Sequence, residues 1–265
     1  MGRPVNTLGD MLRAWRVKDR LSQMALALDA GVSPRHLSFI ETGRSRPSPE
    51  VLLSIAERLN IPLRVRNELL QAAGYAPQFA ETDWDAPDIA SVRIALQRLL
   101  DAHDPFPGVA LDRAWNVVLS NAAAARMVAS LPVHVLTPSI NMFRASLHPH
   151  GFAARTVNFA EWGSYLLTEL DRLVAASSDP AMIALQAEVA GYPNVRALRK
   201  RQGNSPPARP ALLIPCILQH GDMQLSLFTT LATVGSPRDI TLAELTVELF
   251  YPADEVTAAV LRGGV

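Results

Sequence analysis

The chain has 265 residues, of which 49% are hydrophobic and 19% charged, and its formal net charge is zero. This length is enough for two domains or one large one, and the composition excludes a disordered protein. The single cysteine, Cys216, excludes an internal disulfide bond. The N-terminus lacks a signal-peptide core, and the apolar stretches of the chain are too short to span a bilayer. Together with the single cysteine, these features predict a cytoplasmic protein with no membrane partner.

Basic residues are concentrated in the first eighty residues, which carry a surplus of Lys and Arg. Because the whole chain is neutral, the remaining residues carry an equal acidic surplus. A basic N-terminal part joined to an acidic remainder is typical of a protein that meets a polyanion at one end. Taken alone, this asymmetry is a weak indication of nucleic-acid binding.

Four or five short helices are predicted in this basic part. In the first, Leu8, Leu12 and Trp15 share one face at helical spacing. Serine N-caps, two of them followed by proline at the first helical position, predict where the next three helices begin, and glycine predicts where two of the helices end. These signals are Ser22, Ser33-Pro34 and Ser48-Pro49 for the starts, and Gly31 and Gly74 for the ends.

The stretch "LSQMALALDAGVSPRHLSFIETGRSRP" (21–47) resembles the helix-turn-helix of phage-repressor-type (XRE) transcription regulators. The match rests on Gln23 at the start of one helix, Gly31 in the turn and "Ile-Glu-x-Gly-Arg" after the next helix. The resemblance implies that the second helix of the motif enters the major groove of double-stranded DNA. A helical bundle that does not bind DNA is the alternative.

The resemblance also assigns roles to individual residues. Base contacts fall to the exposed side of the third helix, where Arg35 can make a bidentate contact with guanine. Phe39 has two interpretations, a contact with a thymine methyl group or internal packing, and His36 likewise touches a phosphate or is structural. Pro34 departs from the polar residue usual at its position. The predicted base-contacting residues are Ser33, Pro34, Arg35, Ser38 and Phe39, and the predicted backbone contacts are Gln23, His36, Thr42, Arg44, Ser45 and Arg46. Glu41 is expected to be internal and paired with an arginine.

A polar, proline-containing stretch at 77–87 predicts a linker between an all-α helix-turn-helix domain (1–76) and a second domain (88–265). After a helix that ends near residue 100, strands at 109–111 and 115–119 and a helix capped by Asn121 are typical of the opening of a PAS-type sensor domain. Further helices are expected at 137–147, 158–176 and 180–189. The rest of this domain is expected to contain a Gly/Pro-rich loop at 203–210, a hairpin within 211–235, a strand near 245–250 and a short final helix. Together these elements predict an α+β domain whose antiparallel sheet has about five strands.

Three segments of the second domain resemble the ligand-binding domain of MmyB-like transcription regulators, which follows an XRE helix-turn-helix. They are "NMFRASLHPHG" (141–151), "VNFAEW" (157–162) and "ELFYPADE" (248–255). The resemblance implies a PAS-like pocket, a fatty-acid-like ligand and a role in regulating metabolism. A possible bound fatty acid is the only small molecule expected, and no cofactor is required.

Such a pocket needs an apolar lining and a partner for the ligand's head group. The candidate lining residues are Trp115, Val117, Leu136, Phe143, Leu147, Phe159, Trp162, Leu166, Phe228, Leu231 and Phe250. Arg144, His148 and Arg155 are candidate cationic partners, and Asn141 and Asn158 are candidate neutral donors. For each apolar residue plain core packing is the alternative, and for Arg144 it is a structural salt bridge.

No catalytic motif is present, so the sequence predicts no enzyme. His148 and His150 offer two nitrogens, but two spaced this closely with no acidic or thiol companion make a poor metal site, and no metal is expected. Cys216 lies in an apolar β-strand, where a thiol is usually inert.

The sequence therefore predicts a bacterial, cytoplasmic regulator that binds DNA at the nucleoid and whose C-terminal domain senses a small amphipathic ligand. A homodimer would place two recognition helices about one DNA turn apart and favour a near-palindromic operator. The alternative is a DNA-tethered dimerisation or protein-interaction module that has no small-molecule ligand. A hydrolase acting on acyl compounds is disfavoured by the missing motifs.

Overall fold

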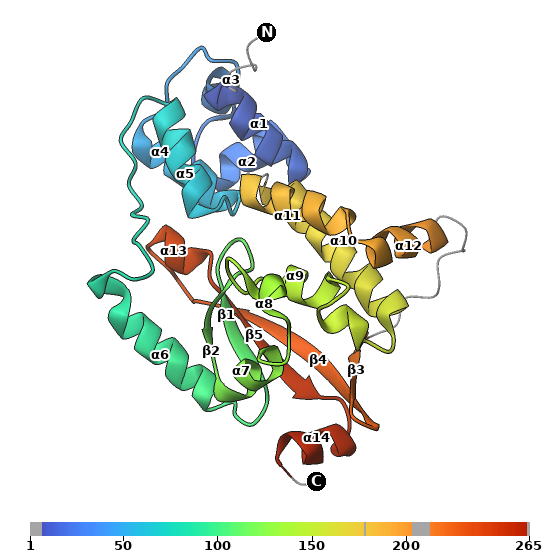
Figure 1. The fold of residues 1–265 in the computed structure, drawn as a ribbon. Helices are drawn as coiled ribbons and strands as arrows, with labels where there is room; N and C mark the ends of the chain where they lie inside the picture. The colour runs from blue at the N-terminus through green and yellow to red at the C-terminus, as the bar shows by residue number, and fades with distance from the viewer. Residues whose placement is uncertain (1–6, 178, 203–212, 264–265) are drawn as a thin grey trace. The chain divides into compact units, whose positions relative to one another are not determined.

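The computed structural model describes residues 7–177, 179–202 and 213–263 (Figure 1). The chain forms two compact units. The first comprises the residues up to Trp84 together with Gly235–Ala243, and the second comprises Asp85–Val234 and the residues from Glu244 onward. The segment Gly235–Ala243 lies within the predicted second domain in sequence, but its nine residues pack with the first unit.

The first unit is entirely helical, as predicted. Ser22, Ser33 and Ser48 each accept a backbone N–H of the helix that they precede, and Gly31 and Gly74 adopt the positive φ expected of helix-ending glycines (φ 70° and 75°). Its helices are α1 (Leu8–Lys18), α2 (Gln23–Asp29), α3 (Pro34–Glu41), α4 (Pro49–Arg58), α5 (Leu63–Ala72) and α13 (Ile240–Ala243).

One apolar core holds these helices together. Leu26 of α2, Leu37 and Ile40 of α3, and Leu52 of α4 are buried completely or nearly so. Gly9 of α1 explains how closely α1 approaches α3, because a Cβ atom there would lie 2.3 Å from the backbone carbonyl oxygen of Glu41. The position of α3, which carries the predicted DNA contacts, is therefore fixed from several sides.

The late segment Gly235–Ala243 is attached to the predicted linker by hydrogen bonds. The Thr82 hydroxyl donates to a carboxylate oxygen of Asp239 at 2.6 Å, and the Thr241 hydroxyl donates to the Thr82 carbonyl at 2.7 Å. The backbone N–H of Ile240 donates to the Ala80 carbonyl at 2.8 Å, and α13 also contacts α5. The end of the predicted linker is thus held in place by residues from far along the chain.

The second unit is an α+β domain with a single five-stranded antiparallel sheet, as predicted. The sheet order is β2-β1-β5-β4-β3. The strands are β1 (Gly108–Leu111), β2 (Val117–Ser120), β3 (Cys216–His220), β4 (Met223–Thr233) and β5 (Thr246–Pro252). The helices are η1 (Pro87–Ile89), α6 (Ala90–Asp101), α7 (Ala122–Val128), α8 (Val133–Leu136), α9 (Met142–Leu147), η2 (Phe152–Ala154), α10 (Phe159–Ser177), α11 (Pro180–Ala190), α12 (Pro193–Gln202) and α14 (Glu255–Leu261).

Two helix predictions in this unit need correction. Of the helix expected at 137–147, only α9 is helical, because Asn141 leaves the helical conformation, caps α9 and bridges to Asn116. The short helix α8 lies before this range and was not predicted. The sequence analysis also missed α12. The predicted loop at 203–210 lies outside the described residues. Within the described parts of the chain, none of the helices combines the length and the hydropathy that crossing a bilayer would require.

Asn121 organises the opening of the sheet as well as capping α7. Its buried side chain accepts the backbone N–H groups of Gly108 and Ala124 at 3.0 Å, and donates to the carbonyls of Leu100 and Phe106 at 3.1 and 2.8 Å. All four hydrogen bonds of a buried amide are therefore satisfied, which ties α6, β1 and α7 into one framework.

Candidate DNA interface and ligand cavity

Helix α3 presents its N-terminal turn to solvent. Leu37 and Ile40 are buried, whereas Ser33, Pro34 and Arg35 are exposed. The guanidinium group of Arg35 lies 5.3 Å from the ring centre of the half-buried Phe39, which gives the arginine a defined direction on the helix. This is the part of a recognition helix that meets base edges.

The other predicted contacts on α3 are less accessible. Ser38 is half-buried, and so is His36, whose buried Nε2 has no hydrogen-bond partner among the described residues. The Ser33 hydroxyl is occupied in accepting the His36 backbone N–H. Of the two interpretations of His36, the geometry favours a structural residue over a phosphate contact through Nε2.

Glu41 lies at the centre of a polar network inside the motif. Arg16 binds its carboxylate with two hydrogen bonds of 2.6 and 2.9 Å, and Gln23 donates a third at 2.8 Å. Burial disfavours the charged form, but the hydrogen bonds from Arg16 and Gln23 outweigh it and lower the pKa of Glu41. The expected internal pairing of Glu41 is present, and the Gln23 amide predicted to contact a phosphate is engaged with Glu41 instead.

The remaining predicted DNA contacts lie in the loop after α3, where some have structural roles and others are accessible. Gly43 has φ 70°, and the Thr42 hydroxyl donates to the Ser38 carbonyl at 2.8 Å. Arg46 donates to the Gly74 carbonyl at 2.9 Å and lies 4.2 Å from the ring centre of Tyr75, so it also has a structural role. Arg44 is exposed and Ser45 is half-buried. Unlike Arg46, the Arg44 side chain has no partner among the described residues, so it is the cation of this loop that stays available.

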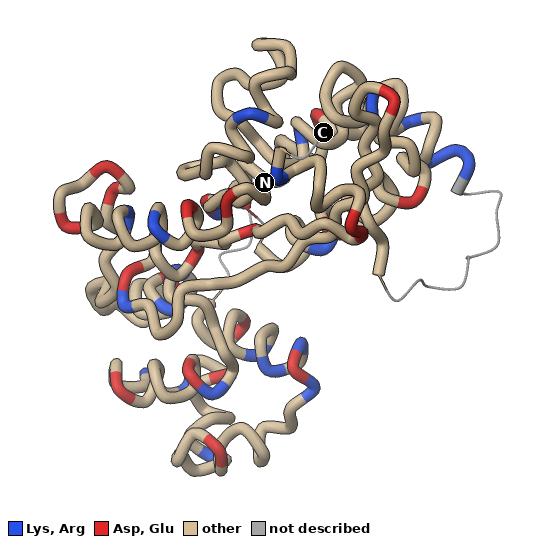
Figure 2. The backbone as a smooth tube through the Cα atoms, turned by 90° about the horizontal axis from the view of Figure 1, so that it is seen from below, with Lys and Arg blue, Asp and Glu red and all other residues tan. Residues whose placement is uncertain are grey.

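Basic side chains also occur outside this motif. The last turn of α12 carries Arg199, Lys200 and Arg201, and Figure 2 shows this concentration of positive charge at the end of the helix. The acidic surplus of the second unit is therefore not uniform along its chain.

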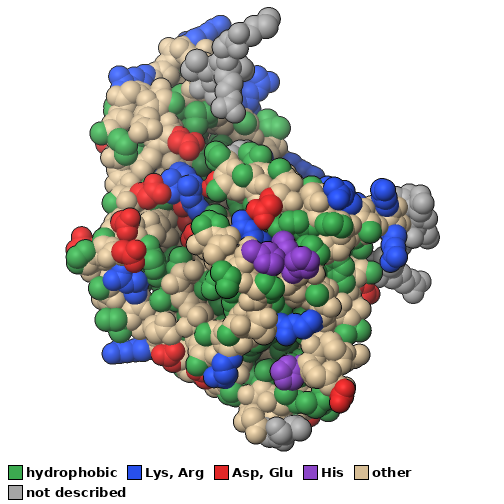
Figure 3. Space-filling view, viewed as in Figure 1, with side chains coloured by type: hydrophobic (Ala, Val, Ile, Leu, Met, Phe, Trp, Pro, Cys, Tyr) green, Lys and Arg blue, Asp and Glu red, His purple; other side chains and the backbone are tan. Residues whose placement is uncertain are grey.

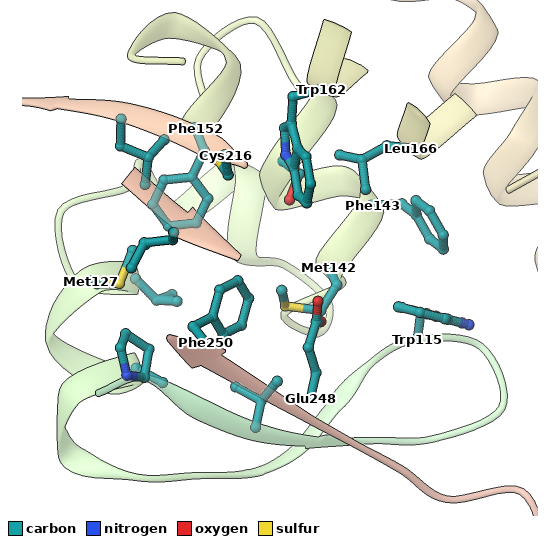
Figure 4. A pocket seen from close by; sticks show the side chains of 17 residues that line it. Trp115, Met127, Met142, Phe143, Phe152, Trp162, Leu166, Cys216, Glu248 and Phe250 are labelled. Carbon is teal, nitrogen blue, oxygen red and sulfur yellow. The ribbon is translucent and has the colours of Figure 1, made fainter. Parts of the chain in front are cut away.

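The second unit contains an apolar cavity of about 70 Å³, part of it open to solvent. It lies between one face of the sheet and the helices α7, α9 and α10 (Figure 4). The lining residues are Pro107, Val109, Trp115, Ala124, Met127, Val128, Met142, Phe143, Ser146, Phe152, Trp162, Leu166, Cys216, Leu218, Leu227, Glu248 and Phe250. Its lining is that of a site for a small apolar molecule.

Trp115 is positioned by the turn between β1 and β2, where it adopts an uncommon positive φ of 64°. Its ring lies 4.9 Å from the ring of Phe143 on α9. Figure 4 shows these two rings at one end of the cavity and Met127 and Phe152 at the other. The cavity therefore lies between two groups of large side chains.

Glu248 of β5 is the one acidic residue in this lining. It is 7% exposed, and its Oε2 atom has no hydrogen-bond partner among the described residues. Burial raises the pKa of its carboxyl group to about 7, although a hydrogen bond with Thr229 acts in the opposite direction. In Figure 4 the carboxyl end of Glu248 lies beside Met142, among apolar side chains. An unpaired carboxyl group in such a place can serve as the polar contact of a ligand.

A second hollow adjoins the apolar cavity. Both are lined by Met127 and Leu218, and the second also includes Arg126, Ser130 and Arg155. Arg155 donates to the Ser130 hydroxyl at 3.0 Å and lies 5.4 Å from the ring centre of Phe152. Cationic groups are thus located just beyond the Met127 end of the apolar cavity.

The structure brings together six of the predicted ligand-binding residues. Five of them line the apolar cavity, namely Trp115, Phe143, Trp162, Leu166 and Phe250. The sixth, Arg155, lines the adjoining hollow. The other apolar candidates lie elsewhere: Leu147 and Phe159 in the core around α10 and α11, Val117 in the core beneath β1, Leu136 half-buried in α8, Phe228 stacked on Tyr251, and Leu231 51% exposed.

The polar candidates other than Arg155 have structural partners. Arg144 forms a two-fold hydrogen-bonded ion pair with Glu188 (2.8 Å each), the alternative noted from the sequence. Asn141 caps α9 and donates to the Ala114 carbonyl at 2.7 Å. Asn158 joins α10 to β3 through the Pro215 carbonyl and the Ile217 N–H. His148 lies against two other histidines. None of these four residues lines either hollow.

Sequence reasoning missed Glu248, although a signal was present. The alternation in β5 places Glu248 on the same face as Phe250, which was predicted to line the pocket, so a strand period of two already directed Glu248 inward. Met127, Met142 and Phe152 had no comparable signal, since methionine and phenylalanine at helical spacing are equally common in a plain core.

Comparisons with known proteins agree with this geometry. The family described as MmyB-like transcription regulator ligand binding domain matches residues 92–263, and the helix-turn-helix family matches residues 12–65. This chain belongs to the MmyB-like transcription regulators. The regulator therefore has a DNA-binding helix-turn-helix and a ligand-binding domain, and both families are families of regulators rather than enzymes.

One solved structure with similarity to the regulator is that of the clp gene regulator ClgR from Corynebacterium glutamicum. The two sequences are 26% identical over 37% of this regulator and 90% of that chain, with a TM-score of 0.23. No curated protein matches the regulator.

Proposed function

We propose that the cavity of this MmyB-like regulator binds an elongated amphipathic molecule of the fatty-acid type, and that binding changes the affinity of the helix-turn-helix for its operator. The observation that carries the proposal is the apolar cavity, which holds the carboxyl group of Glu248, with one oxygen that has no partner among the described residues, and adjoins a hollow with Arg126 and Arg155. An acyl chain requires the first part, and a charged head group requires the second.

The two polar positions favour opposite head groups. A carboxylate would be repelled by an ionised Glu248 and attracted by Arg126 and Arg155, with which it can form charge-assisted hydrogen bonds. A fatty acid therefore fits with its tail beside Trp115 and its carboxylate near Arg155. An alcohol or amine of the same length would instead find its acceptor at Glu248.

The route from cavity to DNA is supported by the course of the chain. Leu227 on β4 and Phe250 on β5 both line the cavity. The segment that joins these two strands includes Gly235–Ala243, which packs in the DNA-binding unit. A ligand that shifts β4 or β5 would thus act on a segment of that unit, and it can change DNA affinity only if it binds the two states differently.

The ligand proposal is tested by thermal-shift titration of the full chain with C12 to C16 fatty acids, and with alcohols and amines of the same length. We expect the acids to stabilise the protein most. Arg155→Gln should weaken acid binding by about tenfold or more, which corresponds to the loss of one charged hydrogen bond. Arg172→Gln, which changes an exposed arginine on α10, is the matched control.

The alternatives have distinct outcomes in the same titration. If only alcohols or amines stabilise the protein, and Glu248→Leu abolishes this stabilisation, then Glu248 rather than Arg155 binds the head group of the ligand. If no probe shifts the melting temperature and no lipid is extracted with organic solvent from the denatured protein, the ligand proposal fails. The chain would then act as a DNA-tethered dimerisation or protein-interaction module.

For DNA, we propose that Arg35 contacts bases and Arg44 contacts the phosphate backbone, in a homodimer bound to a near-palindromic operator. Arg35 is exposed at the N-terminal turn of α3, and Arg44 is exposed in the loop that follows. Arg35→Ala should cost about 1–3 kcal/mol on the best operator and relax base preference. Arg44→Ala should weaken all sequences equally and reduce the salt dependence. An equal loss on every sequence for Arg35→Ala would contradict its role.

A further inference from the structure

Three histidines that are separated in sequence meet on the surface of the second unit. His134 is on α8, His148 follows the end of α9, and His150 lies two residues further on. Each offers one ring nitrogen, and the three nitrogens lie within 4.8 Å of one another. Figure 3 shows a compact group of histidine side chains on the face viewed, over α8 and α9.

The ring positions match a shared tetrahedral metal centre. The three centroid separations are 5.3, 5.4 and 5.4 Å, so the rings form a nearly equilateral triangle. With metal–nitrogen bonds of about 2.0–2.1 Å at tetrahedral angles, imidazole ring centres are about 5.2 Å apart. The same geometry places two ligand nitrogens about 3.3 Å apart, and His150 Nδ1 lies 3.3 Å from His134 Nε2.

The turn that joins His148 to His150 is fixed by the backbone. Gly151 donates its N–H to the His148 carbonyl at 2.8 Å, and a Cβ atom at Gly151 would lie 2.3 Å from the Ala145 carbonyl oxygen. On its other side, the His148 ring contacts Tyr192 edge-on, with centroids 4.9 Å apart. The chain therefore holds the His148 ring in place, and only the exposed rings of His134 and His150 need to adjust.

We propose that His134, His148 and His150 bind one divalent transition-metal ion of the Zn²⁺ class, with a fourth position left open. Imidazole is the ligand that zinc, copper, nickel and iron favour, whereas Mg²⁺ and Ca²⁺ require oxygen. Three protein ligands and an open position are the arrangement of zinc sites that accept water or a further ligand.

Metal binding requires one change at the His148 ring. Nδ1 of His148 accepts the backbone N–H of His150 at 3.0 Å, so the ion must displace this N–H from Nδ1 to bind the ring.

Metal binding would join α8 to the end of α9. Met142, Phe143 and Ser146 of α9 line the apolar cavity, so the ion would fix one wall of the ligand site. The metal site itself does not depend on the proposed ligand, because its three side chains lie outside the cavity lining.

The test is titration of the untagged full chain with Co²⁺, which absorbs strongly in the visible range when tetrahedral, followed by displacement with Zn²⁺. We expect one equivalent to bind and the melting temperature to rise. His134→Ala and His150→Ala should each weaken binding by about tenfold or more. His220→Ala, which changes an exposed histidine outside the cluster, is the matched control and should bind as the native chain does.

Folding of the variants is checked by the far-ultraviolet circular dichroism and melting temperature of the metal-free proteins, with His134→Gln as a second, more conservative change. The proposal is overturned if the native chain binds no stoichiometric Co²⁺, or if His134→Gln and His134→Ala bind it as tightly as the native chain. Loss of binding in His220→Ala alone would place the metal elsewhere and also overturn it.

Discussion

Two buried glutamates, one in each unit, have opposite environments. Glu41 in the helix-turn-helix receives hydrogen bonds from Arg16 and Gln23, and its pKa is lowered despite its burial. Glu248 in the cavity wall has an oxygen without a partner among the described residues, and burial raises its pKa to about 7. The surroundings of Glu41 favour the charged form of its carboxyl group, whereas the surroundings of Glu248 favour the neutral, protonated form.

The difference shows what each unit requires of a buried polar group. A recognition helix must be placed accurately on DNA, and a fully paired carboxylate fixes α1, α2 and α3 to one another. A ligand cavity needs an unsatisfied group that the ligand can complete, at a cost to the stability of the empty protein. A fully paired buried carboxylate therefore indicates a structural role, and a buried carboxyl oxygen without a partner indicates a candidate ligand site.

The largest effect is expected from breaking the paired glutamate. Glu41→Ala leaves the guanidinium of Arg16, 12% exposed, without its partner. Removing one member of a buried ion pair costs about 3–5 kcal/mol, so we expect a loss of about 3 kcal/mol or more in the free energy of unfolding. Urea denaturation measures it, with the exposed Glu57→Ala in the same unit as control. Equal stability of the two variants would show that the network does not hold the motif.

The same pair has an acid dependence. The folded-state pKa of Glu41 is below its ordinary value of 4.5, so its contribution to stability is present above pH 4.5 and is lost as the pH falls through the folded-state pKa. Glu41→Gln should remove this part of the acid destabilisation. Unfolding curves of both proteins between pH 6 and 3 would reveal it.

Glu248 should show the opposite pH dependence. Its folded-state pKa of about 7 exceeds the ordinary value of 4.5, so its contribution to stability is complete below pH 4.5 and is lost as the pH rises towards 7. A shift of this size corresponds to roughly 3 kcal/mol. Glu248→Gln removes the titration, and the variant should be more stable than the native protein at pH 8. Native and variant curves that run parallel from pH 4.5 to 8 would contradict the assignment.

The smallest effect is expected from a third glutamate, which is paired but more exposed. Arg144 binds Glu188 with two hydrogen bonds, yet Glu188 is 39% exposed and is screened by solvent. Arg144→Gln should therefore cost only about 1 kcal/mol, and fatty-acid binding should be unchanged. Thermal denaturation and ligand titration of the same variant check both statements. A large loss of ligand affinity in this variant would show that Arg144 takes part in ligand binding.

Local signals in the sequence were sufficient for most of the fold. Ser33 and Pro34 determine where α3 begins, Gly31 determines where the turn before it lies, and alternation along β5 predicts a strand there, although adjacent residues of β5 are buried on both faces. These features depend on neighbours within a few residues, and a sequence displays such neighbours directly.

The candidate sites were harder to predict because they depend on residues far apart in the chain. Arg144 and His148 were natural head-group candidates from their motif, but Glu188, 44 residues away from Arg144, takes its guanidinium. His134 is 14 residues before His148, and the short helices between them, rather than any spacing rule, bring the rings together. Long-range partners of this kind cannot be identified from one sequence.

The attachment of α13 has a consequence for how the protein is made. Ile240, 3% exposed, and Asp239 belong to the packing of the DNA-binding unit, but they are synthesised more than 150 residues after Thr82. On the ribosome, the helix-turn-helix can fold early, yet its unit is complete only when β4 has been made and β5 is about to follow. A fragment that stops at Trp84 would lack this part, so the regulator assembles a complete DNA-binding unit only once most of its sensor has been translated.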